Sequence, residues 1–299
     1  MPLYSTLKKI GIGTACTLLA LLLIGSVADF GLSSLLYHGS ESGFDKMIES
    51  FSEFPAFWAV CCAGTLLLLR RPRRDRKREL LWGGAGGALI LFGLAFNIRE
   101  TVSNTPQLPG WIPALITVLC TAVVCVLAAH FTQKKPREQL LRLIFLLVFV
   151  SVGTMALTQL LKLFWARPRM RFIYAEGGID FLPWWKGGHT LKKTLIDAGK
   201  AVKDDFRSFP SGHVACASCA MLLPFLTPFS PALRGKEKPL FAAGAVYTAI
   251  VCFSRLTMGA HFLTDVAMSC LLTVLLTAAA YYLFYYNEKT FRFFERLVS

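Results

Sequence analysis

Charged residues are scarce in this chain, and acidic residues are scarcer than basic ones. Of the 299 residues, 17% are charged, whereas soluble globular domains carry about 25%. Asp and Glu number 18 against 32 Lys and Arg. The hydrophobic share is 55% and the mean hydropathy is +0.53. This composition excludes an ordinary soluble domain and indicates a membrane protein with several spans.

The sequence also lacks the patterns of the common metal sites. Asp204-Asp205 is an isolated acidic pair without a clear further ligand for magnesium. Cys216 and Cys219 have the spacing of a redox or metal pair, but no second half of a ligand set accompanies them. All nine cysteines lie in apolar stretches and are expected to be packing residues. We therefore expect neither a metal nor a cofactor.

Eight apolar stretches are long enough to cross a bilayer, which takes about 20 helical residues. They predict an all-α fold, a polytopic helix bundle in the membrane. The first stretch could instead be a secretory signal cleaved after Ala28, but we favour an uncleaved anchor. The stretches run approximately over residues 10–28, 55–69, 80–96, 112–131, 140–165, 213–231, 240–254 and 262–285.

The short runs of basic residues between the spans lie on one side of this eight-span topology. Cytoplasmic loops are enriched in Lys and Arg, so we expect both termini in the cytoplasm of a bacterial inner-membrane protein. The acidic loop with Glu41, Asp45, Glu49 and Glu53 and the segment 166–211 then lie outside. The net charge of +14 does not predict nucleic-acid binding, because it is spread over short runs between spans. These runs are Lys8-Lys9, 70–78, 134–137, 234–238 and the C-terminal tail.

Three cations end the fifth apolar stretch: Lys162, Arg167 and Arg169. Ionisable groups near a membrane core are costly, and those that persist usually face a cavity or a partner. These cations could therefore bind a phosphate group. They could equally extend along the helix to reach lipid phosphates.

The tetrapeptide Pro210-Ser211-Gly212-His213 opens the sixth stretch. Ser211 is at a natural N-cap position, and Gly212 leaves room for a ligand to approach the backbone. Helix N-termini bind anions through free N–H groups and the macrodipole. His213 would then lie beside a bound phosphate, although a simple capping turn with an interfacial histidine is also compatible with the pattern.

The third motif is Ser254-Arg255 with His261 and Asp265. Asp265 follows His261 by four residues, which would place both on one helical face. The carboxylate could accept a hydrogen bond from one ring nitrogen and leave the other as a nucleophile. A lone histidine and aspartate at this spacing are common, so this motif alone leaves the function open.

Together the three motifs resemble the signature of the type 2 phosphatidic acid phosphatase family, which is related to vanadium haloperoxidases. The resemblance implies that His261 attacks phosphorus and that His213 protonates the leaving oxygen. One difference concerns the first motif, where the family usually has Arg-Pro and Arg169 is followed by Met170. The spacing favours Arg169 as the phosphate ligand, with Arg167 either behind it, supporting the residues that contact the phosphate, or as its substitute. The implied phosphate ligands are Lys162, Arg169, Arg255, Ser211, Gly212 and Arg167.

The resemblance further implies a metal-independent lipid phosphate or diphosphate phosphatase that works through a phosphohistidine at the extracytoplasmic face. Its family substrates are undecaprenyl diphosphate, phosphatidylglycerol phosphate, phosphatidate and lipid A phosphates. A phosphotransferase that passes the phosphoryl group to another lipid is an alternative. A transporter of an anionic substrate is another, but no inverted repeat is apparent.

The family core resembles six spans, which would correspond to residues 80–299 with an outer loop at 166–211. Residues 1–79 would then be an added transmembrane pair with a basic cytoplasmic loop. The expected partners are a lipid phosphate substrate and the bilayer, without nucleic acid. The oligomeric state is left open.

Overall fold

The protein is an all-α helix bundle in the computed structural model, which describes residues 2–40, 42–71 and 75–298. Within these residues, eight segments are long and apolar enough to cross a membrane by length and composition. Each overlaps one of the eight stretches expected from the sequence, so the predicted eight-span bundle is confirmed. The segments are Ser5–Leu36, Gly43–Leu69, Arg76–Ser103, Trp111–Thr132, Arg137–Glu176, Gly212–Phe229, Glu237–Thr257 and Leu263–Tyr286.

Five spans consist mainly of one long helix each, although the segment Arg137–Glu176 also includes a short helix at Met170–Glu176, and the other three combine shorter elements. The long helices are α1 (Pro2–Leu36), α4 (Arg76–Ser103), α5 (Trp111–Thr132), α6 (Arg137–Trp165) and α10 (Glu237–Thr257). The composite spans join α2 (Gly43–Phe51) to α3 (Phe54–Leu69), α9 (Gly212–Ser218) to the 3₁₀-helix η2 (Cys219–Phe229), and α11 (Leu263–Tyr281) to the π-helix η4 (Tyr282–Tyr286).

The sixth span changes from α-helix to 3₁₀-helix at Cys219. Pro224 and Pro228 lie in this second half. Proline has no backbone N–H and its ring clashes with the preceding turn, so regular α-helical bonding cannot continue through it. The span is therefore irregular on the side away from His213.

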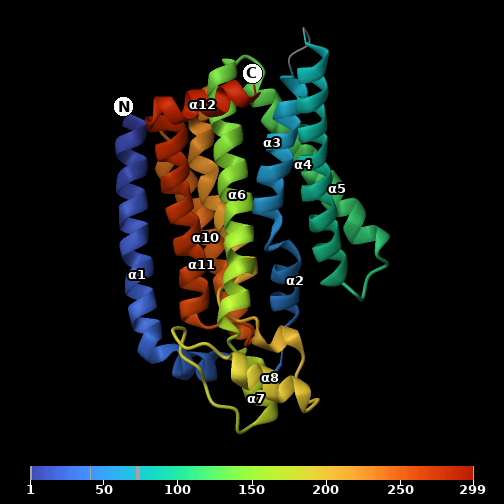
Figure 1. Ribbon diagram of the computed structural model, residues 1–299, viewed down its shortest axis with the longest axis vertical. Helices are drawn as coiled ribbons and strands as arrows, with labels where there is room; N and C mark the ends of the chain where they lie inside the picture. Colours follow the sequence, from blue (N-terminus) through green and yellow to red (C-terminus); the bar gives the residue numbers. More distant parts are fainter. Residues whose placement is uncertain (1, 41, 72–74, 299) are drawn as a thin grey trace.

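The two ends of the bundle differ in what covers them (Figure 1). Both chain termini lie at one end, where α12 (Glu288–Val298) runs across the tips of the spans. The connection between the fifth and sixth spans covers the other end. It contains α7 (Met170–Glu176), α8 (His189–Asp197) and the 3₁₀-helix η1 (Lys203–Phe206), while η3 (Pro231–Leu233) precedes α10.

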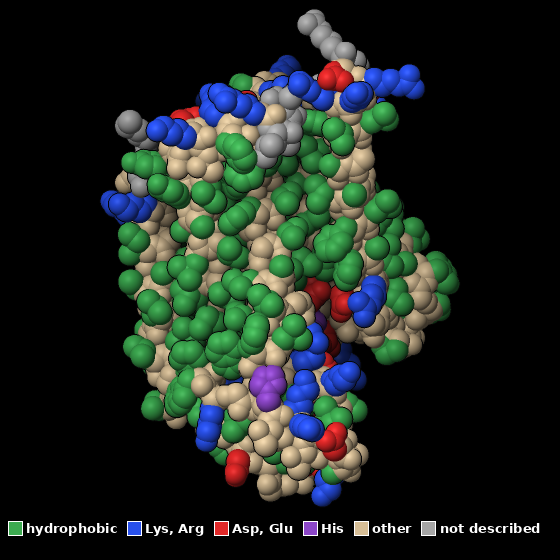
Figure 2. Space-filling view, in the orientation of Figure 1, with side chains coloured by type: hydrophobic (Ala, Val, Ile, Leu, Met, Phe, Trp, Pro, Cys, Tyr) green, Lys and Arg blue, Asp and Glu red, His purple; other side chains and the backbone are tan. Residues whose placement is uncertain are grey.

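The basic runs of the sequence lie at the end that holds the termini, although Figure 2 shows Lys and Arg side chains at both ends of the molecule. The three motifs lie at the opposite end, where α6 and α10 finish and α9 and α11 begin. This separation matches the arrangement expected from the charge pattern. Residues 72–74 of the basic run and Glu41 of the acidic loop lie outside the described residues.

Helices α3 and α4 pack closely because glycines face each other. A Cβ atom on Gly64 would lie 2.6 Å from the carbonyl oxygen of Gly86, and one on Gly86 would lie 2.7 Å from that of Gly64. Small residues allow such close approach of helix backbones in membranes. This contact joins the second half of α3 to the first half of α4 and holds the two helices together. Glu53, which precedes α3, and Glu100, near the end of α4, lie at the motif end of this pair.

Candidate active site

Helix α6 places Lys162 inside the bundle rather than at its surface. Buried residues recur along α6 every three or four positions, which defines one helical face. Lys162 is the last of them and is only 8% exposed. The sequence left open whether it reaches lipid phosphates, and the structure turns it to the interior. The buried residues on the face that carries Lys162 include Leu140, Leu143, Leu147, Val150, Thr154 and Thr158, and the first two turns of α6 are buried on other faces as well.

The Lys162 ammonium lies beside the start of α9. Its Nζ is 3.8 Å from the position that a Cβ on Gly212 would take. Within the described part of the chain, it makes no hydrogen bond and no ion pair within 4 Å. The cation therefore remains available to a ligand at Gly212 and His213.

Ser211 caps α9 as the sequence predicted. Its side-chain oxygen accepts a hydrogen bond from the Val214 N–H at 3.4 Å, and Gly212 is the first helical residue. The Ser211 carbonyl in turn accepts from the Ser269 hydroxyl at 2.8 Å, which fixes the cap against α11. His213 lies in the first turn of the helix, with 23% of its side chain exposed.

His261 lies just before α11 and is almost fully buried. Its Nδ1 is 2.6 Å from the carbonyl oxygen of Ser208 and 3.7 Å from Oδ2 of Asp265. The carbonyl is thus the nearer partner, and the carboxylate acts at ion-pair range. The predicted contact with Asp265 is present, but it forms across the start of α11 rather than along one helical face, because the helix begins only at Leu263. The sequence did not indicate Ser208.

The His261 imidazole is held neutral. Burial lowers the pKa of His261 to about 3, an effect aided by the charges of Lys162 and Arg169 and opposed by Asp265. Since Nδ1 is committed to Ser208, Nε2 is the nitrogen left with a free lone pair. A neutral, oriented imidazole is what nucleophilic attack requires.

Asp265 is held by donors from three sides. Its Oδ2 accepts from the Ser208 hydroxyl at 2.5 Å and from the Phe262 N–H at 2.8 Å. Its Oδ1 accepts from the Arg167 guanidinium at 2.5 Å. The carboxylate is therefore fixed, and it fixes the segment that carries His261.

Arg167 is fully buried and bridges two carboxylates. Its Nη2 lies 2.9 Å from Asp29, its Nη1 contacts Asp265, and its Nε donates to the Leu182 carbonyl at 2.8 Å. The guanidinium also lies 4.2 Å from the ring centre of Phe262. Because all three nitrogens are engaged by the protein, the alternative of Arg167 as a phosphate ligand does not fit this arrangement.

Asp29 is a site residue that the sequence analysis missed. It lies on α1, is 2% exposed, and accepts from the Thr264 N–H at 3.0 Å as well as from Arg167. The available signal was a lone acidic residue within the first long apolar helix, which is costly unless it is paired. Helix α1 thereby reaches the candidate nucleophile through two ion pairs.

Arg169 and Arg255 are both partly engaged. Arg169 pairs with Asp204 at 2.9 Å, and Arg255 pairs with Glu49 at 2.7 Å and also donates to the carbonyl of Asp45. The Nε atoms of both arginines are buried without a partner among the described residues. Each guanidinium thus retains a donor for a ligand.

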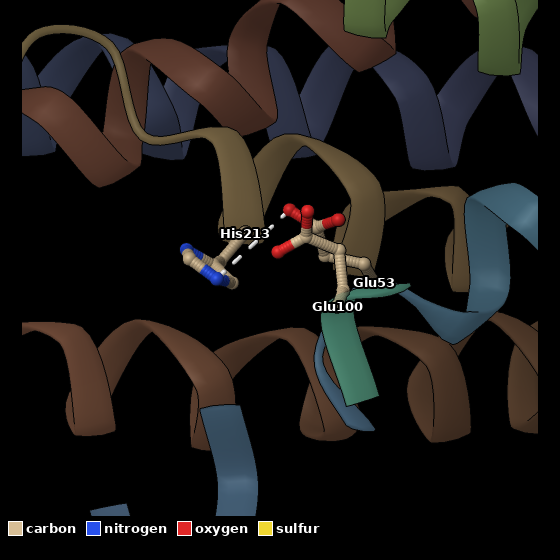
Figure 3. Close-up of side chains that lie close together, drawn as sticks. All are labelled: Glu53, Glu100 and His213. Atoms are coloured by element: carbon tan, nitrogen blue, oxygen red, sulfur yellow. Dashed lines mark ion pairs between the residues drawn. The ribbon is translucent and has the colours of Figure 1, made fainter. Parts of the chain in front are cut away.

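Two further glutamates lie beside His213. The ligand atoms of His213, Glu53 and Glu100 all lie within 4.8 Å of one another, close enough to hold a cation. Figure 3 shows the three side chains pointing toward a common point. The sequence analysis found no acidic cluster of this kind, since the residues come from three elements that only the fold brings together.

A large apolar cavity lies next to this end of α3. Its volume is about 670 Å³, and it runs between α3, α5, α6, η2 and α10. Phe51 and Phe54, which flank Glu53 in the chain, line it, and Trp58 continues the lining deeper along α3. Figure 2 shows acidic and basic side chains gathered in a hollow on the same half of the molecule as the motif end.

A family model matches the half of the chain that carries the three motifs. The model of the PAP2 superfamily matches residues 139–289, from α6 through η4. Phosphatidylglycerophosphatase B of Bacillus subtilis (strain 168) is 34% identical over 86 residues, which cover 25% of this chain and 42% of that protein. The match thus spans less than half of that relative. No solved structure matches the chain. The family model covers half of the chain and all three motifs, and the protein therefore belongs to the PAP2 superfamily.

Proposed function

We propose that this protein is a lipid phosphate phosphatase that works through a phosphohistidine on His261. One observation carries the proposal. A buried, neutral histidine, a second histidine and an unpaired lysine converge at one end of the spans. Nucleophilic displacement at a phosphate needs a nucleophile, a general acid and a cation, and His261, His213 and Lys162 can supply these three roles.

The reaction has two steps. In the first, Nε2 of His261 attacks phosphorus while the P–O ester bond breaks, and His213 gives its proton to the leaving oxygen, which departs as an alcohol. In the second, water attacks the phosphohistidine and passes its proton to His213. The N–P bond breaks and orthophosphate leaves.

The phosphoryl oxygens are stabilised by Lys162, Arg169 and Arg255 and by the N-terminus of α9. Lys162 is unpaired, and Arg169 and Arg255 each keep a free Nε. The amide of Gly212 adds the partial positive charge of the α9 start. Donors that are fixed before the reaction often supply the largest share of phosphoryl-transfer catalysis.

The large apolar cavity supports a lipid substrate. Its residues Phe51 and Phe54 adjoin Glu53, so an acyl chain in the cavity would begin next to His213. A transporter would bind its substrate near the midplane of the membrane. The candidate site lies instead where the spans end, which favours an enzyme.

We infer that the site faces the extracytoplasmic side of a bacterial inner membrane, with both termini in the cytoplasm. The basis is that the short runs of Lys and Arg between the spans lie at the opposite end of the bundle. Substrates of the family include diphosphates and monoesters, and the relative named phosphatidylglycerophosphatase B supports a monoester.

The test is a phosphate-release panel with protein purified in detergent. The substrates are undecaprenyl diphosphate, phosphatidylglycerol phosphate, phosphatidate and a lipid A phosphate. We expect release of free phosphate from at least one lipid without an added acceptor, unaffected by excess chelator and inhibited by vanadate. Release only when a lipid acceptor is added would indicate a phosphotransferase, and a strict need for magnesium would overturn the metal-independent mechanism.

A further inference from the structure

Glu53 and Glu100 are carboxylates that no Lys or Arg side chain of the described residues pairs with, and the one ion-pair contact of Glu53 is with His213. Glu53 lies 3.9 Å from Nε2 of His213, and Glu100 shares the same 4.8 Å cluster (Figure 3). Within residues 2–40, 42–71 and 75–298, neither side chain accepts a hydrogen bond. Glu53 has only 17% of its side chain exposed. Carboxylates at such positions require donors, and the protein supplies none.

The neighbouring Glu49 behaves differently. Its carboxylate pairs with Arg255 at 2.7 Å, so its charge is compensated within the protein. Its distance to Nε2 of His213 is 3.8 Å, close to that of Glu53. Glu53 and Glu100 therefore lack the arginine partner that compensates the charge of Glu49.

A second, independent observation points to a ligand here. Lys162 is more than nine-tenths buried, unpartnered, and directed at Gly212 beside the same histidine. Around His213 the site thus offers an ammonium and two carboxylates that make no hydrogen bond to the described residues. A ligand that satisfies both needs an anionic part and a part that donates hydrogen bonds.

The proposed reaction assigns places to these two parts. The phosphate belongs with Lys162, Arg169 and Arg255. The leaving oxygen belongs with His213, which protonates it, so Glu53 and Glu100 lie within reach of the leaving group. Carboxylates accept hydrogen bonds from hydroxyl and ammonium groups and repel anions.

We propose that Glu53 and Glu100 select lipid phosphomonoesters whose leaving alcohol carries a hydroxyl or ammonium group next to the ester oxygen. This inference rests on the proposed phosphatase function. It disfavours diphosphates, because their leaving group is itself a phosphate and would depart into two carboxylates. It also disfavours esters whose neighbouring hydroxyls are all acylated, since these have no donor to offer.

The test uses two lipids that differ in one donor, with a diphosphate as the third. Lysophosphatidate has a free hydroxyl on the carbon next to the phosphorylated carbon. In its methyl ether this hydroxyl is methylated, so the lipid is of similar size but has no hydrogen-bond donor there. We expect wild-type protein to hydrolyse the hydroxyl lipid with a kcat/KM at least about tenfold above that of the ether. Farnesyl diphosphate in the same detergent should be the poorest of the three.

Substitution separates recognition from a structural effect. Glu100→Met should lower the ratio of kcat/KM for lysophosphatidate to kcat/KM for its methyl ether about tenfold, and raise the rate on farnesyl diphosphate relative to the ether. Glu53→Gln should move the three substrates in the same directions. A structural role would lower all three rates together. Glu176→Gln, which removes an exposed carboxylate from α7, is the matched control and should change none of them.

The outcomes distinguish the two levels of the proposal. If wild-type protein releases no phosphate from any phospholipid, the proposed function fails and this inference with it. If it hydrolyses the hydroxyl lipid and the ether equally, or if the variants change all substrates alike, only the inference is overturned. Loss of the preference in excess chelator, with recovery on adding a divalent cation, would also overturn it, because a metal ion would then be the partner of the two carboxylates.

Discussion

The two histidines of the candidate site lie in opposite kinds of surroundings. Around His261, the carboxylates of Asp265 and Asp29 and the guanidinium of Arg167 all have partners within the protein. Around His213, Lys162 and Glu53 lack hydrogen bonds to the described residues. We call the surroundings of His261 the closed region, because its charged groups all have partners within the protein. We call the surroundings of His213 the open region, because Lys162 and Glu53 there need a ligand to supply their hydrogen bonds. This difference indicates where the protein holds its reacting atom and where it leaves room for the substrate.

The largest effect is expected from removing the reacting imidazole. His261→Ala should lower phosphate release at least about a thousandfold, because no other group in the closed region can replace the nucleophile. The measurement is phosphate release in detergent at matched protein concentration. His130→Ala removes an exposed histidine on α5 and should keep full activity. Near-normal turnover by His261→Ala would remove the proposed nucleophile.

The second largest effect is expected from removing Arg167, which bridges Asp29 and Asp265 in the closed region. Arg167→Met leaves Asp29 and Asp265 buried without their shared counter-charge, which should cost about 3–5 kcal/mol of unfolding free energy. Thermal unfolding in detergent measures the loss. The double variant with Asp29→Asn should recover part of it, because one of the two uncompensated charges is then gone. A variant of normal stability with a raised KM would instead identify Arg167 as a phosphate ligand.

The neutral state of His261 should make stability depend on pH. In the unfolded chain a histidine titrates at about 6.5, whereas in the folded protein the pKa of His261 is lowered to about 3. Between these values the unfolded state binds the extra proton, so stability falls as pH falls from 6.5 toward 3. The expected loss for this one group is about 2 kcal/mol between pH 7.5 and pH 5. His261→Gln should lose correspondingly less over the same range, and equal slopes for both proteins would contradict the neutral assignment.

The smallest effect is expected from removing one hydrogen-bond donor of the closed region, the hydroxyl of Ser208. Ser208→Ala removes the hydroxyl that donates to Asp265 but keeps the carbonyl that holds His261. We expect about a tenfold loss in kcat, as for one hydrogen bond to a charged group. Ser218→Ala removes another buried hydroxyl, bonded to Thr273 at 2.6 Å, and is the control expected to affect stability alone. A loss of kcat in both variants would argue for a general packing defect.

Much of the closed region could not be predicted, although its motif could. The order and spacing of His261 and Asp265 are visible in the chain, and so is the excess of charge at span ends. The partnership of Asp29 with Arg167 depends on how α1 is rotated against α11. That rotation follows from packing over the whole length of two helices, which a pattern of apolar residues does not specify.

Only part of the open region could be predicted from the sequence. Lys162 and His213 belong to recognisable motifs, whereas Glu53 and Glu100 belong to none. They reach His213 because facing glycines bring α3 and α4 together and because α3 starts near the end of α4. The acidic loop was predicted on the correct end of the bundle, but its distance from the site was not. The division at residue 80 between an added pair and a six-span core stays a prediction.

The sequence alone determined the number of spans, the common end of the three motifs and the family. These follow from apolar length, from the alternation of chain direction at each span, and from short local spacings. Only the tertiary structure decided that Arg167 is a bridge and that Lys162 faces the interior. It also decided that two glutamates from outside the family match lie beside the proposed acid. Such facts depend on contacts between residues far apart in the chain, and their physical cause is the burial of charge, which forces each ionisable group to take whatever partner the packing places within reach.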